Sequence, residues 1–150
     1  PGRDLRQASR GNEWKVAWLD NPEETPWFRE GLEQSTRAVA RIEELARTEG
    51  FPILIVVYPY PKMMAENKMR NDYTLFWQKF AEERRIPFLD LSPLFEDPGK
   101  SPAQVYAENF IPGDFHWNAR GSARVAEALL PWIRENLPAR AVKSSREPSR

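Results

Sequence analysis

The chain has 150 residues, 41% of them hydrophobic and 12% aromatic, which is enough for the core of one domain or most of one. Its 22 basic and 22 acidic residues cancel, which argues against binding nucleic acid or an anionic membrane through bulk charge. It has no cysteine and one histidine, which excludes disulfides, thiol catalysis, thiolate metal sites and multi-histidine metal sites.

The first 25 residues give weak structural signals. Residues 1–13 are polar and predict irregular structure without a signal-peptide core, and Trp14–Leu19 predicts a short strand. The chain does not begin with Met, so we expect a fragment, a processed form or a trimmed part of a longer protein. No run in the chain approaches the ~18 apolar residues of a bilayer span.

A helix followed by a buried strand is predicted next. Thr25 is a good N-cap and Pro26 suits the first helical position, after which apolar residues recur at helical spacing until Gly50. The run Ile53–Tyr58 is short, apolar and β-branched, which is typical of a buried parallel strand.

The pattern then repeats. Prolines 59 and 61 end the first strand, because proline cannot donate to a ladder. We expect, in chain order, a loop or short helix, a second helix, a second strand and a proline-rich connection with one helical turn, over residues 62–70, 72–85, 86–91 and 92–106.

The last elements are a loop, a helix and a tail. Ile111–Trp117 predicts the loop, and Asn118 caps a helix that runs to about Asn136 and is bent by Pro131. Residues 138–150 are polar and predict a solvated tail, so the expected domain covers residues 1–137.

The order helix, strand, helix, strand, helix predicts an α/β fold with a parallel sheet. Two strands alone leave open apolar edges, which soluble proteins avoid. We therefore expect the missing N-terminal segment of the polypeptide, or another chain, to complete the sheet.

The candidate catalytic residues are Asp114 and His116. Histidine is the usual proton shuttle near neutral pH, and a carboxylate two residues earlier is able to bond Nδ1, fix the tautomer and leave Nε2 to take a proton. Trp117 is placed to shield the pair from water, and Asn118 to anchor the loop. The competing interpretation is an ordinary surface loop, because D-x-H is a short pattern.

The segment IPGDFHWNARGSARVAEALLPWI resembles the last conserved block of SGNH (GDSL-type) hydrolases. ILIVVYPYP and IPFLDLSPLF resemble two earlier strands of that family, so the order agrees over roughly residues 26–135. The form D-x-H-W-N-x-x-G also resembles SGNH-like polysaccharide O-acetyltransferases.

The resemblance implies a flavodoxin-like three-layer α/β/α fold, here incomplete, and ester hydrolysis or acyl transfer through an acyl-serine without metal or cofactor. It implies that His116 is the base and Asp114 its orienter, that a small ester or an acylated carbohydrate is the substrate, and that the setting is extracytoplasmic. Nothing in the residues themselves shows export.

The family's nucleophile motif, Gly-Asp-Ser after a first strand, is absent, as are its oxyanion-hole glycine and Gly-x-Asn-Asp motif. Asp20-Asn21 is a faint candidate for the last of these, but an Asx turn before Pro22 is the better interpretation. None of the chain's serines has the expected context, so we expect the nucleophile in a segment preceding Pro1.

Tyr58 and Tyr60 follow the first strand, at the sheet edge where open α/β sheets bind ligands. They and Trp117 are candidate substrate-binding residues, against the alternative of simple packing. Two alternatives to an enzyme remain: a non-catalytic SGNH-like binding or scaffold domain, and, more weakly, a flavodoxin-like regulatory module.

Overall fold

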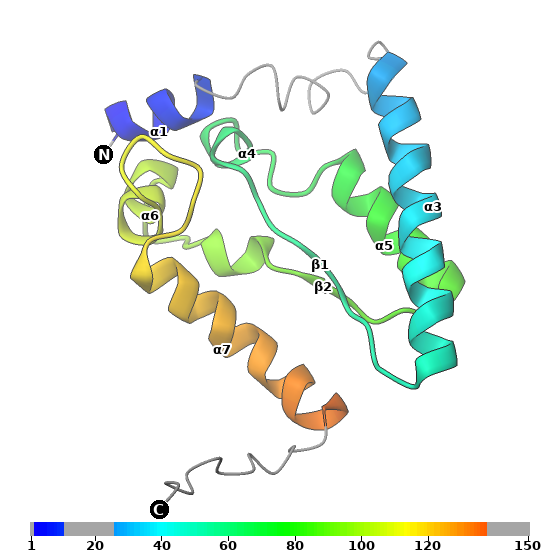
Figure 1. The fold of residues 1–150 in the computed structure, drawn as a ribbon. Helices are drawn as coiled ribbons and strands as arrows, with labels where there is room; N and C mark the ends of the chain where they lie inside the picture. The colour runs from blue at the N-terminus through cyan, green and yellow to red at the C-terminus, as the bar shows by residue number, and fades with distance from the viewer. Residues whose placement is uncertain (1, 11–25, 138–150) are drawn as a thin grey trace, which may run out of the picture.

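The computed structural model describes residues 2–10 and 26–137 (Figure 1). The strand expected at Trp14–Leu19 and the tail expected at residues 138–150 lie outside the described residues. The described elements are α1 (Gly2–Arg10), α3 (Pro26–Glu49), β1 (Ile55–Val57), α4 (Pro61–Ala65), α5 (Asp72–Arg84), β2 (Phe88–Asp90), the 3-10 helix η2 (Ser92–Phe95), α6 (Pro102–Asn109) and α7 (Ala119–Asn136).

The sheet consists of β1 and β2, paired in parallel with Ile55 opposite Phe88 and Val57 opposite Asp90. Helix α5 makes the crossover between them and contacts both strands. Each strand has three residues, shorter than the two apolar runs in the sequence. Apolar character extends beyond the hydrogen-bonded part, because residues flanking a strand are also packed against helices.

Helices lie on both sides of this sheet, α3 and α5 on one side and α7 on the other (Figure 1). This arrangement is a small part of a three-layer α/β/α fold, as expected from the sequence, with a helix-rich composition and an incomplete sheet. Helix α3 ends as predicted at Gly50, whose φ of +72° is the left-handed conformation that glycine adopts readily.

A cluster of buried residues lies beyond the carboxyl ends of the strands, where α1, α4, α6 and α7 meet. Tyr106 and Phe110 of this cluster are fully buried. Its buried members are Leu5, Met63, Met64, Met69, Leu91, Phe95, Val105, Tyr106, Phe110 and Val125. This buried cluster therefore includes Tyr106 and Phe110, which directly precede the loop that carries His116.

The prediction of irregular structure for residues 1–13 is wrong over residues 2–10, which form α1. The helix packs against α4 and α6 and inserts Leu5, which is 5% exposed, into the core. A single apolar anchor in a polar run gives no helical periodicity, so the tertiary contact that stabilises this helix is invisible in the sequence.

The proline-rich connection holds more structure than the single turn expected. Residues 92–95 form η2 and residues 102–109 form α6. Pro102 occupies the first turn of α6, and Ser101 and Gln104 bond each other's backbone N–H groups in a capping box. Pro102 thus starts a helix of eight residues in a segment where only one helical turn was expected.

Among the described helices, none combines the length and the apolar character that crossing a bilayer requires.

Candidate active site

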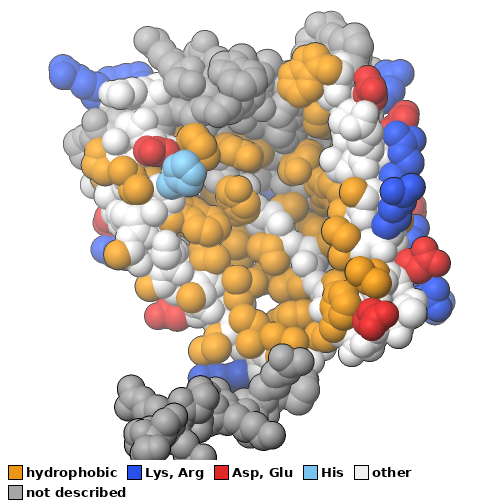
Figure 2. All heavy atoms as spheres, viewed as in Figure 1, with side chains coloured by type: hydrophobic (Ala, Val, Ile, Leu, Met, Phe, Trp, Pro, Cys, Tyr) orange, Lys and Arg blue, Asp and Glu red, His pale blue; other side chains and the backbone are white. Residues whose placement is uncertain are grey.

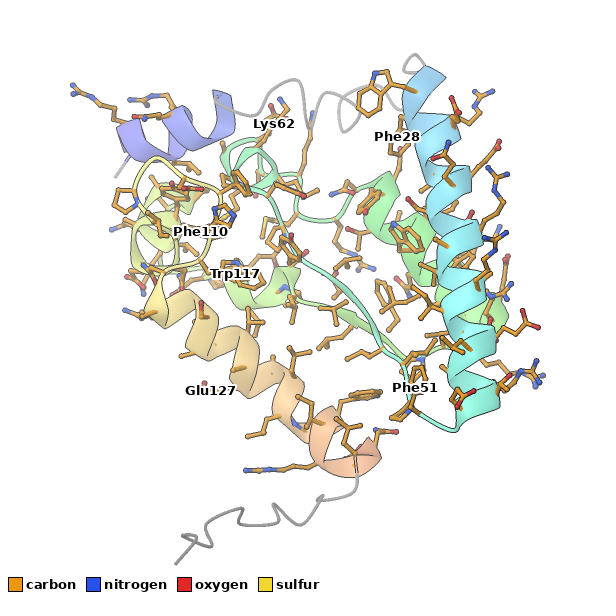
Figure 3. The ribbon with its side chains drawn as sticks, viewed as in Figure 1. Phe28, Phe51, Lys62, Phe110, Trp117 and Glu127 are labelled. Atoms are coloured by element: carbon orange, nitrogen blue, oxygen red, sulfur yellow. The ribbon has the colours of Figure 1, made fainter. Side chains whose placement is uncertain are left out.

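The loop between α6 and α7 carries Asp114 and His116, and its two ends are joined to each other. Phe110 and Trp117 form an isolated antiparallel bridge (Figure 3). The Ile111 N–H donates to the His116 carbonyl at 3.0 Å, and the Asn118 N–H donates to the Asn109 carbonyl at 3.0 Å. The loop is therefore closed at its base and presents its tip as a rigid unit.

The tip of the loop holds the acid and the histidine in direct contact. Oδ1 of Asp114 lies 2.8 Å from Nδ1 of His116. The same oxygen accepts hydrogen bonds from the backbone N–H groups of Phe115 at 2.6 Å and His116 at 3.2 Å. The hydrogen bond from His116, together with these backbone bonds, lowers the pKa of the Asp114 carboxyl below its ordinary value.

This contact directs the other ring nitrogen away from Asp114. With Nδ1 donating to a carboxylate, Nε2 of the neutral ring carries the lone pair. The described residues place no hydrogen-bond partner on Nε2, and the His116 side chain is 64% exposed against 42% for Asp114. The ring is thus oriented and accessible to a group from outside the described residues.

Tyr106 of α6 holds the loop from below. Its hydroxyl donates toward the carbonyl oxygens of Ile111 at 2.8 Å and Asp114 at 2.7 Å. It also accepts a hydrogen bond from the Asp114 N–H at 3.0 Å. Because the Tyr106 ring is fully buried, these bonds tie the backbone of Asp114 to the core.

Asn118 holds the loop from the other end. Its Oδ1 accepts from the N–H groups of Arg120 at 2.9 Å and Gly121 at 3.0 Å, which caps α7 as predicted. Its Nδ2 donates to the carbonyls of Glu108 at 3.1 Å and Phe110 at 3.2 Å. One side chain thus joins the start of α7 to the end of α6.

Gly121 lies where the start of α7 meets the end of α6, and no larger residue fits there. A Cβ on Gly121 would lie 2.1 Å from the carbonyl oxygen of Asn109. The first turn of α7 therefore packs directly on the backbone of α6, which explains the glycine of the D-x-H-W-N-x-x-G pattern. A second glycine, Gly113, has a φ of +76° at the turn before Asp114.

The three candidate substrate-binding residues form one aromatic cluster. The ring centroid of Tyr58 lies 5.0 Å from that of Trp117 and 5.7 Å from that of Tyr60. Burial, with a further contribution from neighbouring Tyr58, raises the pKa of Tyr60 to about 12, so its phenol stays protonated at ordinary pH. Tyr58 is the accessible member, at 43% exposed.

Trp117 does not shield the pair as we expected. Its ring turns toward Tyr58 and stacks on Phe95 with centroids 6.2 Å apart, which leaves Asp114 and His116 exposed in the described part of the chain. Its indole N–H is buried and has no acceptor among the described residues. The indole ring packs into the apolar core because burying so large a ring stabilises the fold more than covering Asp114 and His116 would.

A family model described as the SGNH hydrolase-like domain of acetyltransferase AlgX matches residues 18–149. The chain belongs to this family. The match covers the expected order of elements, and residues 18–25 and 138–149 of it lie outside the described residues. Neither a curated protein nor a solved structure matches the chain.

Among the described serine side chains of this SGNH hydrolase-like domain, two have structural roles and two are exposed on helices. Ser92 is buried and donates to the Met69 carbonyl at 3.3 Å, and Ser101 caps α6. Ser35 and Ser122 are exposed on α3 and α7. None of the hydrogen bonds between described residues joins a serine hydroxyl to His116.

Two residues beside the loop were missed in the sequence: Tyr106, and Asn109 with its close approach to Gly121. Asn109 is fully buried, and its side-chain N–H donates to the Val105 carbonyl at 2.7 Å. The only signal in the sequence was the helix-starting Ser101-Pro102 with Gln104 at the capping-box position. That signal predicts α6 but not which of its residues touch the loop.

Proposed function

We propose that this chain supplies the base and its orienter, His116 and Asp114, to a serine esterase or O-acyltransferase of the SGNH hydrolase-like kind. The observation that carries the proposal is the 2.8 Å contact between Nδ1 and the Asp114 carboxylate, in a loop tied down by Tyr106 and Asn118. An acid that fixes the tautomer and a ring open at Nε2 are the requirements for activating a hydroxyl nucleophile.

In the proposed mechanism, the nucleophile is a serine in a part of the polypeptide outside residues 1–150. Nε2 of His116 takes the hydroxyl proton as the serine oxygen attacks the ester carbonyl, and the resulting imidazolium is stabilised by Asp114. His116 then gives the proton to the leaving alcohol, which leaves an acyl-serine. Water or an acceptor hydroxyl resolves this intermediate, with His116 again acting as base.

Tyr58, with Tyr60 and Trp117 behind it, is the proposed contact surface for the substrate. The cluster is placed against the loop because Trp117 directly follows His116 in sequence and contacts Tyr58. An exposed tyrosine face suits the apolar face of a sugar ring or an acyl chain, and Tyr60 stays a neutral hydrogen-bond donor. An acylated carbohydrate or a small ester fits this surface.

A non-catalytic binding domain of the same fold is the alternative. It is favoured by the exposure of His116 and by the absence of a serine partner among the described residues. In that case Asp114 and His116 stabilise the loop, and the aromatic cluster binds a carbohydrate without turnover.

The deciding experiment labels the longest native form of the protein with a fluorophosphonate and maps the label by mass spectrometry. We expect one labelled serine outside residues 1–150, with labelling slowed about 10²- to 10⁴-fold in His116→Ala. Asn71→Ala, which removes the cap of α5 and touches neither Asp114 nor His116, is the matched control and keeps its labelling. A folded protein that takes no label, or a His116→Ala variant that labels normally, contradicts the proposal.

A further inference from the structure

The side chain of Trp117 joins the loop of His116 to the proposed substrate surface, and no hydrogen bond to a described residue fixes it. Its indole N–H is buried and has no acceptor among those residues. Two ring contacts hold the indole instead, one with Phe95 at 6.2 Å between centroids and one with Tyr58 at 5.0 Å. The orientation of Trp117 therefore depends on how firmly these neighbouring rings are held.

Phe95, at the end of η2, is the buried member of these two neighbours. It is 3% exposed, whereas Tyr58 is 43% exposed. The rings of Phe95 and Trp117 are nearly parallel, with an angle of 10° between their planes. The ring of Tyr58 packs on Trp117 at an angle of 66°. Phe95 is therefore the ring that sets the plane of Trp117, and Tyr58 packs against the plane so set.

The plane of Trp117 is important because this residue directly follows His116. Figure 2 shows the chain's one histidine, in pale blue, at the border of the hydrophobic side chains that gather on this face of the molecule. A ligand on the exposed ring of Tyr58 thus lies beside the loop of His116. A turn of the Trp117 ring would move the Tyr58 surface relative to the proposed base.

Arg124 of α7 reaches the ring of Phe95 from a partly buried position. Its Cζ lies 5.9 Å from the centroid of the Phe95 ring. Its Nη1 donates to Oδ1 of Asn109 at 3.3 Å, which ties the guanidinium to the fully buried end of α6. A guanidinium at this distance over an aromatic ring is attracted by the π electrons of the ring, and the attraction strengthens when water is excluded.

The carboxylates on the elements around Arg124 pair with other cations. Asp97 lies 3.5 Å from the ammonium of Lys100. Glu108 lies 2.8 Å from the same ammonium and 3.1 Å from the guanidinium of Arg120. Among the described residues, none forms an ion pair with Arg124. Its positive charge is therefore left to act on the Phe95 ring, as a simple surface ion pair would not allow.

We propose that Arg124 is a positioning residue of this site, which holds the ring of Trp117 in its plane through Phe95. Because Tyr58 packs on that ring, Arg124 also sets the surface that contacts the substrate. Arg124 itself does not touch the reacting groups. Its effect on substrate binding rests on the proposed function, whereas its effect on the orientation of Trp117 does not.

Fluorine NMR of the full-length protein, labelled with 5-fluorotryptophan, tests the positioning without an assay of activity. The signal of Trp117 is identified by its loss in Trp117→Phe. We expect Arg124→Met, which keeps an unbranched side chain but removes the guanidinium, to shift or broaden this signal. Arg134→Met, at an exposed arginine of the same helix, is the matched control and leaves the signal in place. A Trp117 signal that is the same in both variants overturns the proposal.

Two further variants separate the charge of Arg124 from its hydrogen bond. Arg124→Lys keeps a cation that is able to lie over Phe95, and Arg124→Gln keeps a donor for Asn109 without the charge. We expect the lysine variant to retain a Trp117 signal near that of the wild type, and the glutamine variant to resemble Arg124→Met. If glutamine preserves the signal at least as well as lysine does, the route through Phe95 is wrong.

Steady-state hydrolysis of p-nitrophenyl acetate by the full-length protein tests the effect on the substrate surface. We expect Arg124→Met to raise KM by about twofold to tenfold, the equivalent of one cation–π contact, with kcat changed less than KM. Arg134→Met keeps both constants. An unchanged KM beside a shifted Trp117 signal overturns the link to the substrate surface. If the wild type does not hydrolyse the ester, the proposed function has failed, and the NMR result alone decides the role of Arg124.

Discussion

The buried hydroxyl of Tyr106 bonds both backbone polar groups of Asp114, accepting from its N–H at 3.0 Å and lying 2.7 Å from its carbonyl oxygen. The residue that orients the histidine is thus held through its main chain, which leaves its carboxylate available to Nδ1. Tyr106 is anchored in the core of the domain, and its hydrogen bonds fix the backbone of Asp114 relative to that core.

Tyr106→Phe tests this tether. The ring still fills its place in the core, but the backbone groups of Asp114 and Ile111 lose a buried partner, so we expect a loss of about 1–3 kcal/mol in the free energy of unfolding. We also expect a lower kcat in the full-length protein, because the Asp114–His116 geometry loosens. Urea denaturation and steady-state kinetics measure the two effects, and a variant that matches the wild type in both contradicts the tether.

Gly121→Ala and Gly31→Ala are expected to change stability in opposite directions. At Gly121 the new Cβ meets the Asn109 carbonyl oxygen at 2.1 Å, so the joint between α6 and α7 must shift, at a cost of about 1–3 kcal/mol. At Gly31, inside α3, nothing lies within 4 Å of the new Cβ, and alanine stabilises the helix by about 0.5–1 kcal/mol. Thermal melts of both variants check the signs, and equal shifts show that the contact at Gly121 is not formed.

Asn118→Ala removes both the cap of α7 and the bonds to Glu108 and Phe110. We expect a loss of about 1–2 kcal/mol in stability, together with a loss of activity in the full-length protein. Asn71→Ala removes the comparable cap of α5, where the side chain accepts from the Thr74 N–H, and is expected to lose stability only. If both variants lose activity equally, the effect comes from general destabilisation and not from the loop.

The Asp114 carboxylate makes stability depend on pH in a defined direction. Its pKa is lowered in the folded state, so its contribution is fully present above the unfolded-state value and is lost as the pH falls through the folded-state value. The stability difference between wild type and Asp114→Asn is therefore constant near neutrality and shrinks in acid. Urea denaturation of both proteins near neutral pH and in acid measures this difference. A difference that grows on acidification contradicts the role given to Asp114.

Tyr58→Ala tests the aromatic surface. Because Tyr58 is the accessible member of the cluster, we expect a higher KM of the full-length protein with little change in kcat. Leu75→Ala, at a side chain of similar exposure on α5, is the control. An unchanged KM in Tyr58→Ala assigns the cluster to packing alone.

The sequence by itself determined the features that depend on local chemistry. Pro26 and Gly50 bound α3, and Asn118 caps α7 through its own side chain, so these helices follow from neighbouring residues. Asp114 and His116 are two residues apart in one short loop, so their closeness follows from the local sequence, whereas Tyr106 and Asn118 hold that loop in place. The family, too, was recognisable from the block around them.

Only the tertiary structure decided the rest, because those features depend on contacts between segments far apart in sequence. Helix α1 packs on α4 and α6 and adds Leu5 to the buried cluster that also holds Met63, Met64 and Val105, and no pattern within residues 1–13 encodes that packing. The turn of Trp117 toward Tyr58 and Phe95 was set by the apolar core, which overrode the shielding role expected beside His116. Burial of such side chains is a property of the assembled layers, so the local sequence fixes the Asp114–His116 pair, and long-range packing fixes how the loop around it is held.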